Sequence, residues 1–114
     1  MSDILMITTR RTLVPVPLTD IRYFEKSLRL IFLHTVNDRY RYYGDFRQLT
    51  GRLDQRFCRC HYSFIVNLER VVKLEDHQFI MDCGSRVLIS QRRYAAARAA
   101  FIAYYTTERI SCQK

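Results

Sequence analysis

The stretch FCRCHYSFIVN, from Phe57 to Asn67, carries core-forming and hydrogen-bonding side chains more densely than any other part of the chain. Apolar side chains lie at both of its ends, and polar groups lie between them. Because an unpaired buried charge is costly, we expect Arg59 and His61 at the surface. The pattern predicts a polar crest (residues 59–63) that core side chains hold at both ends, with Asn67 forming a turn or a cap. A strand edge with a solvated middle is the alternative interpretation.

Outward from the crest, apolar alternation predicts roughly eight or nine short strands joined by local hairpins. The expected ranges outside the crest are Ile4–Thr9, Leu13–Val16, Ile21–Glu25, Arg29–His34, Arg39–Tyr43, Leu68–Leu74, Gln78–Met81 and Arg86–Ile89. The sequence therefore indicates a mainly β protein rather than one of alternating β-α-β units.

Finer features of these elements can also be predicted. Ile21 and Tyr23 are expected on one face of their strand and Phe24 on the other, with a polar break at residues 26–27. Helical spacing after Asp45 predicts a short capped helix with Phe46, Leu49 and Leu53 on one side. Ser90 fits the N-cap of a second helix that runs to about Tyr105, with an apolar face at Tyr94, Ala97, Phe101 and Tyr104 or Tyr105.

The chain is long enough for one domain, and its 48% apolar content is that of a globular protein. Its net charge of +8 and pI near 9.7 indicate a polyanionic partner, either nucleic acid or an anionic membrane surface. The basic residues are 16 arginines and 3 lysines. This bias suits recognition of phosphate and guanine, and a genome-wide preference for arginine is the alternative explanation.

The four cysteines, Cys58, Cys60, Cys83 and Cys112, lack the spacing of a disulfide framework. No signal-peptide pattern precedes the first strand, and the apolar run from 94 to 105 is shorter than the ~20 residues that span a bilayer. We therefore expect a cytoplasmic protein with reduced thiols.

Enzyme chemistry is not expected, because neighbouring strand residues such as Cys60 and His61 face opposite sides and cannot share a proton. No glycine-rich phosphate loop or paired carboxylate motif is present. The C-x-C spacing of Cys58 and Cys60 does not match a zinc knuckle, so neither a metal nor a cofactor is predicted. Cys60 is either a thiol activated by its cationic neighbours or a small, half-buried apolar group.

The predicted start of the second helix carries an electrostatic conflict. Arg92 and Arg93 lie at the positive end of the helix dipole, which disfavours cations there by a few tenths of a kcal/mol each. A phosphate bound at this position reverses the sign, since backbone N–H groups and guanidinium groups then share one anion. The alternative is that both arginines point into solvent.

Residues 59–68, RCHYSFIVNL, closely resemble the signature of LytTR DNA-binding domains. The resemblance extends over about residues 4–104, through DIRYFE at 20–25 and LIS at 88–90 followed by Arg92 or Arg93. It predicts a LytTR-like domain over residues 1–106 and a tail at 107–114. It also implies an elongated arrangement of short antiparallel β-sheets with one short helix and a C-terminal helix.

By resemblance, the expected function is sequence-specific binding of double-stranded DNA by a bacterial transcription regulator. Members of this family insert loops into two successive major grooves and contact the minor groove between them. Direct-repeat promoter sites and a homodimer on the DNA are implied partners, with no small-molecule substrate. Carried over by position, the DNA-contacting residues are Lys26, Arg29, Arg59, His61, Tyr62, Ser63, Ser90, Arg92 and Arg93.

Two departures and two alternatives accompany this hypothesis. Tyr62 stands where the family commonly has a basic or amide residue, so this contact is expected to be weaker or differently specific. Most relatives carry a receiver domain, for which this chain has no room, so it is either a stand-alone regulator or an isolated domain. The alternatives are a protein-interaction module that pairs with and antagonises a related regulator, and binding to an anionic membrane, for which no suitable basic amphipathic helix is present.

Overall fold

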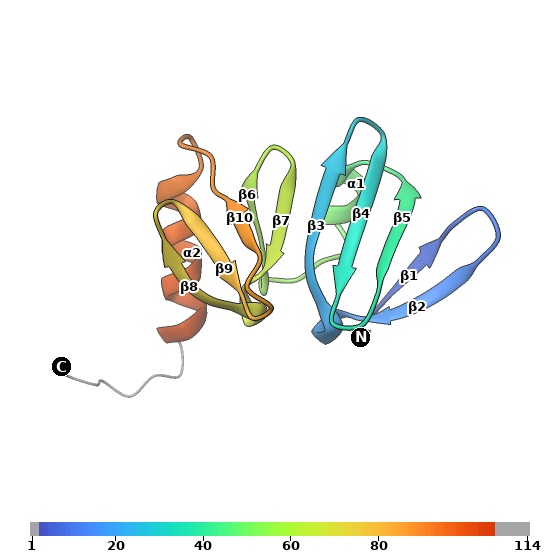
Figure 1. Ribbon diagram of the computed structural model, residues 1–114, viewed down its shortest axis with the longest axis horizontal. Helices are drawn as coiled ribbons and strands as arrows, with labels where there is room; N and C mark the ends of the chain where they lie inside the picture. Colours follow the sequence, from blue (N-terminus) through green and yellow to red (C-terminus); the bar gives the residue numbers. More distant parts are fainter. Residues whose placement is uncertain (1–2, 107–114) are drawn as a thin grey trace.

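A computed structural model describes residues 3–106 as a row of small sheets along one long axis (Figure 1). Its principal extents are 52 × 30 × 25 Å. The predicted tail at 107–114 lies outside the described residues. The elements are β1 (Ile4–Thr8), β2 (Leu13–Pro17), a 3-10 helix (Leu18–Asp20), β3 (Ile21–Ser27), β4 (Leu30–Thr35), β5 (Arg39–Tyr43), α1 (Phe46–Thr50), β6 (Phe57–His61), β7 (Phe64–Asn67), a second 3-10 helix (Leu68–Arg70), β8 (Val71–Glu75), β9 (Gln78–Met81), β10 (Arg86–Leu88) and α2 (Tyr94–Thr106).

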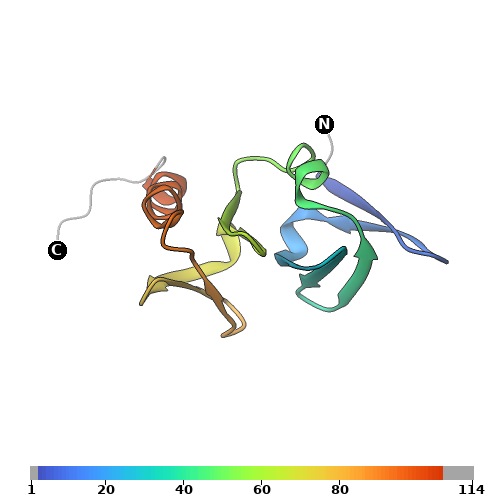
Figure 2. The ribbon, with the colours of Figure 1, turned by 90° about the horizontal axis from the view of Figure 1, so that it is seen from above.

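Three sheets succeed one another along the long axis, and all of their strand pairs are antiparallel. β1 and β2 form a hairpin, the central sheet has the order β5-β4-β3-β7-β6, and the last sheet has the order β10-β9-β8. From above, the β1–β2 hairpin and α1 lie on the same side of β3–β5, and α2 lies beside the last sheet (Figure 2). The elongated, mainly β architecture with a short helix and a C-terminal helix is confirmed.

Two apolar cores lie on opposite sides of the junction between the sheets. The first is enclosed by the β1–β2 hairpin, α1 and strands β3–β5, and it contains Phe24 and Phe46. The second is enclosed by β6–β7, the last sheet and α2, and it contains Phe79. β7 serves both cores, since alternate strand side chains point to opposite faces: Ile65 packs in the first and Val66 in the second. This double burial explains the unbroken apolar run at residues 64–66, directly after the crest.

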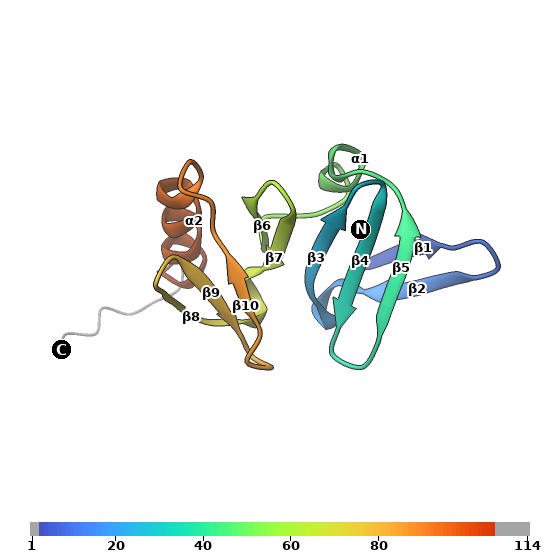
Figure 3. The same ribbon diagram turned by 45° about the horizontal axis from the view of Figure 1, so that its top comes forward.

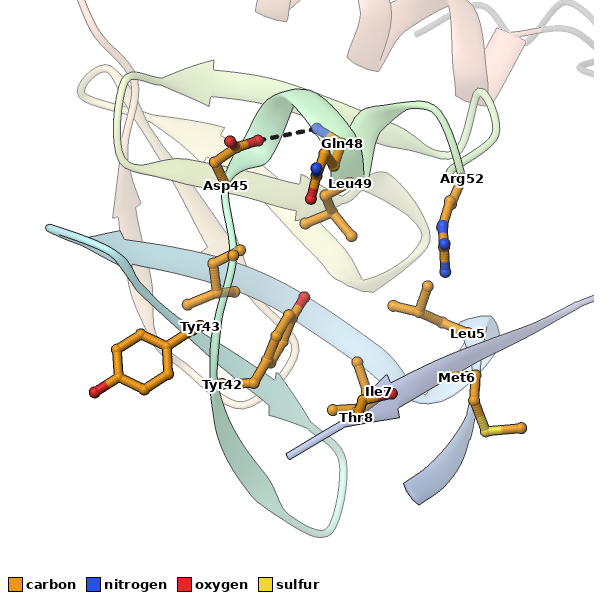
Figure 4. Close-up of a pocket in the computed structure, with 12 residues that line it drawn as sticks. Leu5, Met6, Ile7, Thr8, Tyr42, Tyr43, Asp45, Gln48, Leu49 and Arg52 are labelled. Atoms are coloured by element: carbon orange, nitrogen blue, oxygen red, sulfur yellow. Dashed lines mark hydrogen bonds between the residues drawn. The ribbon is translucent and has the colours of Figure 1, made fainter. Parts of the chain in front are cut away.

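The predicted apolar faces are confirmed for α2 and in part for α1. Phe46 and Leu49 of α1 are buried, but α1 ends at Thr50, so Leu53 packs against the first core from beyond the helix. Asp45 caps α1 by accepting a hydrogen bond from the backbone N–H of Gln48 at 3.1 Å, beside a cleft of about 510 Å³ between β1, the end of β5 and α1 (Figure 4). In α2, Ala97 is buried, and Tyr94, Phe101 and Tyr104 pack against the second core. In the described part of the chain, neither helix has the length and apolarity that crossing a bilayer requires.

Local irregularities overturn three of the predictions. The polar break at 26–27 is wrong, because β3 continues to Ser27. A register shift between Ile21 and Tyr23 changes the alternation, so that Ile21 and Phe24 share the first core while Tyr23 packs against the second. Residues 68–70, predicted as strand, form a 3-10 helix instead.

The side-chain amide of Asn67 forms hydrogen bonds that stabilise the junction between the two cores. Its side chain is fully buried, and Nδ2 donates to the carbonyl oxygens of Ile21 at 2.8 Å and Leu18 at 3.4 Å. Its Oδ1 accepts from the backbone N–H of Glu69 at 2.9 Å, which caps the second 3-10 helix. One side chain therefore joins the end of β7 to the start of β3, and the predicted cap at Asn67 is confirmed.

Replacing Asn67 by Ala is expected to destabilise the domain by about 3 kcal/mol, because the cap is lost and buried carbonyl groups lose their donor. Thermal unfolding followed by circular dichroism measures this loss as a lower Tm. The matched control is Asn37→Ala, at an exposed position, which should leave the Tm nearly unchanged. Equal Tm values for both variants would contradict the structural role of Asn67.

Candidate nucleic-acid interface

Three connections that are distant in sequence lie along one long edge of the molecule. They are the β3–β4 turn with the end of β3 (residues 26–29), the β6–β7 turn with the end of β6 (59–63) and the β10–α2 connection (89–93). We call these three segments the three-turn edge. Figure 1 shows them along the upper edge, and Figure 3 brings this edge forward. All the DNA-contacting residues that the sequence predicts are on this edge.

Main-chain hydrogen bonds fix the relative positions of the three turns. The N–H of Lys26 donates to the carbonyl of Ser63 at 2.8 Å, which joins the first turn to the second. The N–H of Ser90 donates to the carbonyl of Cys60 at 2.8 Å, which joins the third turn to the second. The β6–β7 turn is therefore the centre of the edge, and its position does not depend on flexible side chains.

Arg59 holds the β6–β7 turn in shape. Its Nη2 donates to the carbonyl of Tyr62 at 2.9 Å, and its Nε to that of His61 at 3.4 Å. The guanidinium carbon lies 5.1 Å from the ring centroid of Phe46 and 5.7 Å from that of Tyr62, within the range of cation–π attraction. Within residues 3–106, Nη1 has no acceptor, so Arg59 both orders the turn and retains a donor for a ligand.

Positive charge accumulates between the second and third turns. Desolvation by burial, together with the nearby positive charge of Arg93, lowers the pKa of Arg59 below its usual value. Neither arginine forms an ion pair with any carboxylate in the described part of the chain. The two guanidinium groups therefore repel each other without a compensating anion, an arrangement that a bound phosphate would stabilise.

The remaining crest residues present donors and an aromatic surface. His61 accepts the N–H of Ser63 on Nδ1 at 3.0 Å, so its neutral ring carries the proton on Nε2, which remains available to donate. Tyr62 is 65% exposed, and Lys26 Nζ lies 5.1 Å from its ring centroid. Tyr62 is thus suited to stacking or to a single hydrogen bond.

The two outer turns place their arginines differently. Arg29 is exposed at the tip of the β3–β4 turn, where Leu28 adopts a φ of 57°. At the other end, Ser90 Oγ accepts the N–H of Arg93 at 3.2 Å, but α2 begins at Tyr94. The predicted helix start at Ser90 is wrong, because i→i+3 bonds form a separate turn there. Arg92 is exposed and Arg93 half-buried in the turn that leads into α2.

The hypothesis of an activated thiol at Cys60 is overturned by burial. Desolvation raises the pKa of Cys60 and raises that of Cys58 to about 11, so neither is a ready thiolate. Cys83 is exposed, and although burial acts to raise its pKa, hydrogen bonding with Ser85 and the charge of Arg22 lower it overall. Among residues 3–106, no three histidine, cysteine or acidic side chains are grouped to hold a metal ion.

Known proteins resemble this chain in sequence and in fold. The model of the LytTr DNA-binding domain family matches residues 11–102. The chain belongs to this family. A LytTr DNA-binding domain of a Bacillus cereus response regulator has the same fold, with a TM-score of 0.74 and 24% identity over 90% of this chain and 98% of that one.

Among curated proteins, this chain is similar to the accessory gene regulator protein A of two staphylococci. Identity is 38% for Staphylococcus epidermidis and 40% for Staphylococcus aureus, in each case over 65 residues and 54% of this chain. The aligned region is 26% of each relative, so the chain spans about a quarter of their length.

Sequence reasoning missed the side chains that support the edge from below. Phe46 was identified only as a core residue at helical spacing, yet its ring also lies beneath the guanidinium of Arg59. No sequence signal links them, because they lie on separate elements of the central region. The hydrogen bond from the N–H of Ser90 to the carbonyl of Cys60 likewise cannot be predicted from the sequence, because any residue type has these backbone groups.

In a Cys112→Ser background, one thiol per native chain, that of Cys83, is expected to react rapidly with a disulfide reagent at pH 8. Cys58 and Cys60 should react only after unfolding, because burial suppresses their thiolate forms. Thiol titration with and without denaturant provides the measurement. The control, Cys83→Ser in the same background, should remove the rapid phase. Rapid modification of Cys60 would contradict its burial.

Proposed function

We propose that this LytTr domain binds double-stranded DNA sequence-specifically as the DNA-reading part of a bacterial transcription regulator. In this proposal the three-turn edge faces the duplex, with turns in two successive major grooves and a contact to the minor groove between them. The proposal goes beyond the family assignment, because it names the residues and the DNA grooves that are in contact. A cytoplasmic location is part of the proposal.

The observation that carries the proposal is the uncompensated pair of Arg59 and Arg93. The hydrogen bond from the N–H of Ser90 to the carbonyl of Cys60, at 2.8 Å, holds the turns that carry them side by side. Burial, together with the positive charge of Arg93, lowers the pKa of Arg59. Two arginines elsewhere in the fold are neutralised: Asp82 pairs with both Arg22 and Arg70, at 2.6 and 3.0 Å. A surface where cations are left unneutralised supports a polyanionic ligand.

The dimensions of the domain support simultaneous contact with two grooves. Successive major grooves on one face of B-DNA are about 34 Å apart, and the longest extent of the domain is 52 Å. The three turns are distributed along this axis (Figure 1). The main-chain hydrogen bonds between the turns fix their relative positions before DNA binds, which limits the conformational entropy lost on binding.

The side chains on the edge divide into base-reading and phosphate-binding candidates. An exposed arginine such as Arg92 can donate two parallel hydrogen bonds to guanine, the commonest specific contact in the major groove. His61 can donate one hydrogen bond from Nε2 to a base-edge acceptor. Lys26 and Arg29, at the opposite end of the edge, are assigned mainly to phosphates. Two copies on direct-repeat sites, with a homodimer on the DNA, complete the proposal.

Selection from a random duplex pool with non-specific competitor tests the proposed function. Recovery of a defined sequence is expected, with an affinity that falls steeply as salt rises because each neutralised phosphate releases counterions. Retention without sequence preference would overturn specific reading. Absence of salt-dependent DNA binding would instead favour the second hypothesis, a protein-interaction module that pairs with a related regulator.

Replacing Arg92 or Arg93 by Ala should reduce affinity for the selected duplex by about 1–3 kcal/mol if the lost contact is to a base. Loss of a phosphate contact should weaken all sequences alike. Stability should be unchanged or slightly higher for Arg93→Ala, because its repulsion of Arg59 is removed. Titration of specific and non-specific duplexes, with thermal melting, separates these outcomes.

The matched control for this prediction is Arg98→Ala, which removes an exposed arginine from within α2. It should leave the preference for the selected sequence intact. Unchanged affinity in Arg92→Ala, Arg93→Ala and the double variant would refute the role of the third turn.

A further inference from the structure

A second basic site lies outside the three-turn edge. It is a cleft of about 860 Å³ between the β1–β2 turn and the adjoining ends of β4 and β5. Arg10, Arg11 and Arg41 line it together with hydroxyl groups of the β1–β2 turn, and no carboxylate is among its lining residues. The composition of this cleft suits an anion.

The β1–β2 turn holds two of the arginines in a fixed setting. The N–H of Thr9 donates to the carbonyl of Thr12 at 2.8 Å, and the N–H of Thr12 donates to Thr9 Oγ1 at 3.1 Å. Arg10 and Arg11 occupy the centre of this doubly closed turn and are exposed. Since the backbone is already ordered, an anion that binds here does not have to immobilise the loop.

The three arginines of the cleft have no neutralising partner among the described residues. Arg10, Arg11 and Arg41 form no ion pair or side-chain hydrogen bond with any residue from 3 to 106. By contrast, Arg56 lies near three carboxylates, those of Asp54, Glu69 and Asp3. The cleft therefore resembles the three-turn edge, where cations are also left without neutralising partners.

The cleft adjoins the β3–β4 turn, since Leu30, which follows Arg29, is one of its lining residues. Tyr43, which is 78% exposed, lines both this cleft and a smaller one that Lys26 and Arg29 border. The N–H of Gly44 donates to the carbonyl of Arg29 at 3.0 Å, which fixes the end of β5 against the turn. Tyr42 points toward β1 and Tyr43 points away from it (Figure 4). In Figure 1 the β1–β2 hairpin projects beyond β5 at the far end of the long axis.

We propose that Arg10, Arg11 and Arg41 bind backbone phosphates of the duplex just beyond the base pairs reached by the β3–β4 turn. The inference rests on the proposed function and extends it by a fourth, sequence-independent contact. Guanidinium groups bind phosphate oxygens through paired, charge-assisted hydrogen bonds, and their number adds to the counterions released. The contact lengthens the footprint on one side only.

The test compares the wild type with Arg10→Ala/Arg11→Ala on two duplexes that contain the selected sequence. The first duplex has long flanks, and the second is trimmed on the side bound by the β3–β4 turn. On the long duplex the double variant should lose about tenfold in affinity, and its salt dependence should be shallower by about one unit of slope per arginine. On the trimmed duplex the two proteins should bind alike. Adding Arg41→Ala should deepen the loss only on the long duplex.

The matched control is Arg86→Ala, which removes one exposed arginine next to the β9–β10 turn on the opposite edge (Figure 1). It should bind both duplexes like the wild type, and melting curves should show that all variants are folded. Equal affinity of wild type and double variant on the long duplex, or an equal loss on both duplexes, would overturn the phosphate site while leaving the three-turn account intact. If the wild type selects no sequence, the proposed function itself fails.

Discussion

The buried amide of Asn67 is the interaction on which the rest of the structure depends. Two of its hydrogen bonds join the end of β7 to Leu18 and to the start of β3, and the third caps the second 3-10 helix. They lie at the boundary where Ile65 enters one core and Val66 the other. Because β3 and β7 are fixed side by side, their turns emerge at the same edge. Because α2 packs against the second core, its start lies beside the β6–β7 turn.

The distribution of paired and unpaired arginines gives this domain two chemically different surfaces. Where Arg22 and Arg70 converge on Asp82, opposite charges tie β3 to the last sheet. Along the three-turn edge and the adjoining cleft, arginines lack acidic partners among the described residues. Positive charge without an acidic partner is thus present where a ligand can reach it. Such an arrangement favours rapid association with a polyanion at some cost in self-repulsion.

Much of this architecture can be predicted from the sequence, because alternating apolar residues and the crest signature are local patterns. The strand at Arg39–Tyr43, the Asp45 cap and the apolar face of α2 follow from such patterns. The bulge near Arg22 and the continuation of β3 through Ser27 do not, because pairing with β4 and β7 determines them. The family resemblance indicated the contact residues, but only the fold shows that Arg59 also orders its own turn and lies near Arg93.

The central claim is that all three turns contact one duplex at the same time. Amide chemical-shift mapping by NMR, with the selected duplex added to the isotopically labelled protein, tests it most directly. The account predicts the largest changes in residues 26–29, 59–63 and 89–93 and small changes in the β9–β10 turn on the opposite edge. Changes confined to one of the three turns, or concentrated around the β9–β10 turn, would contradict it.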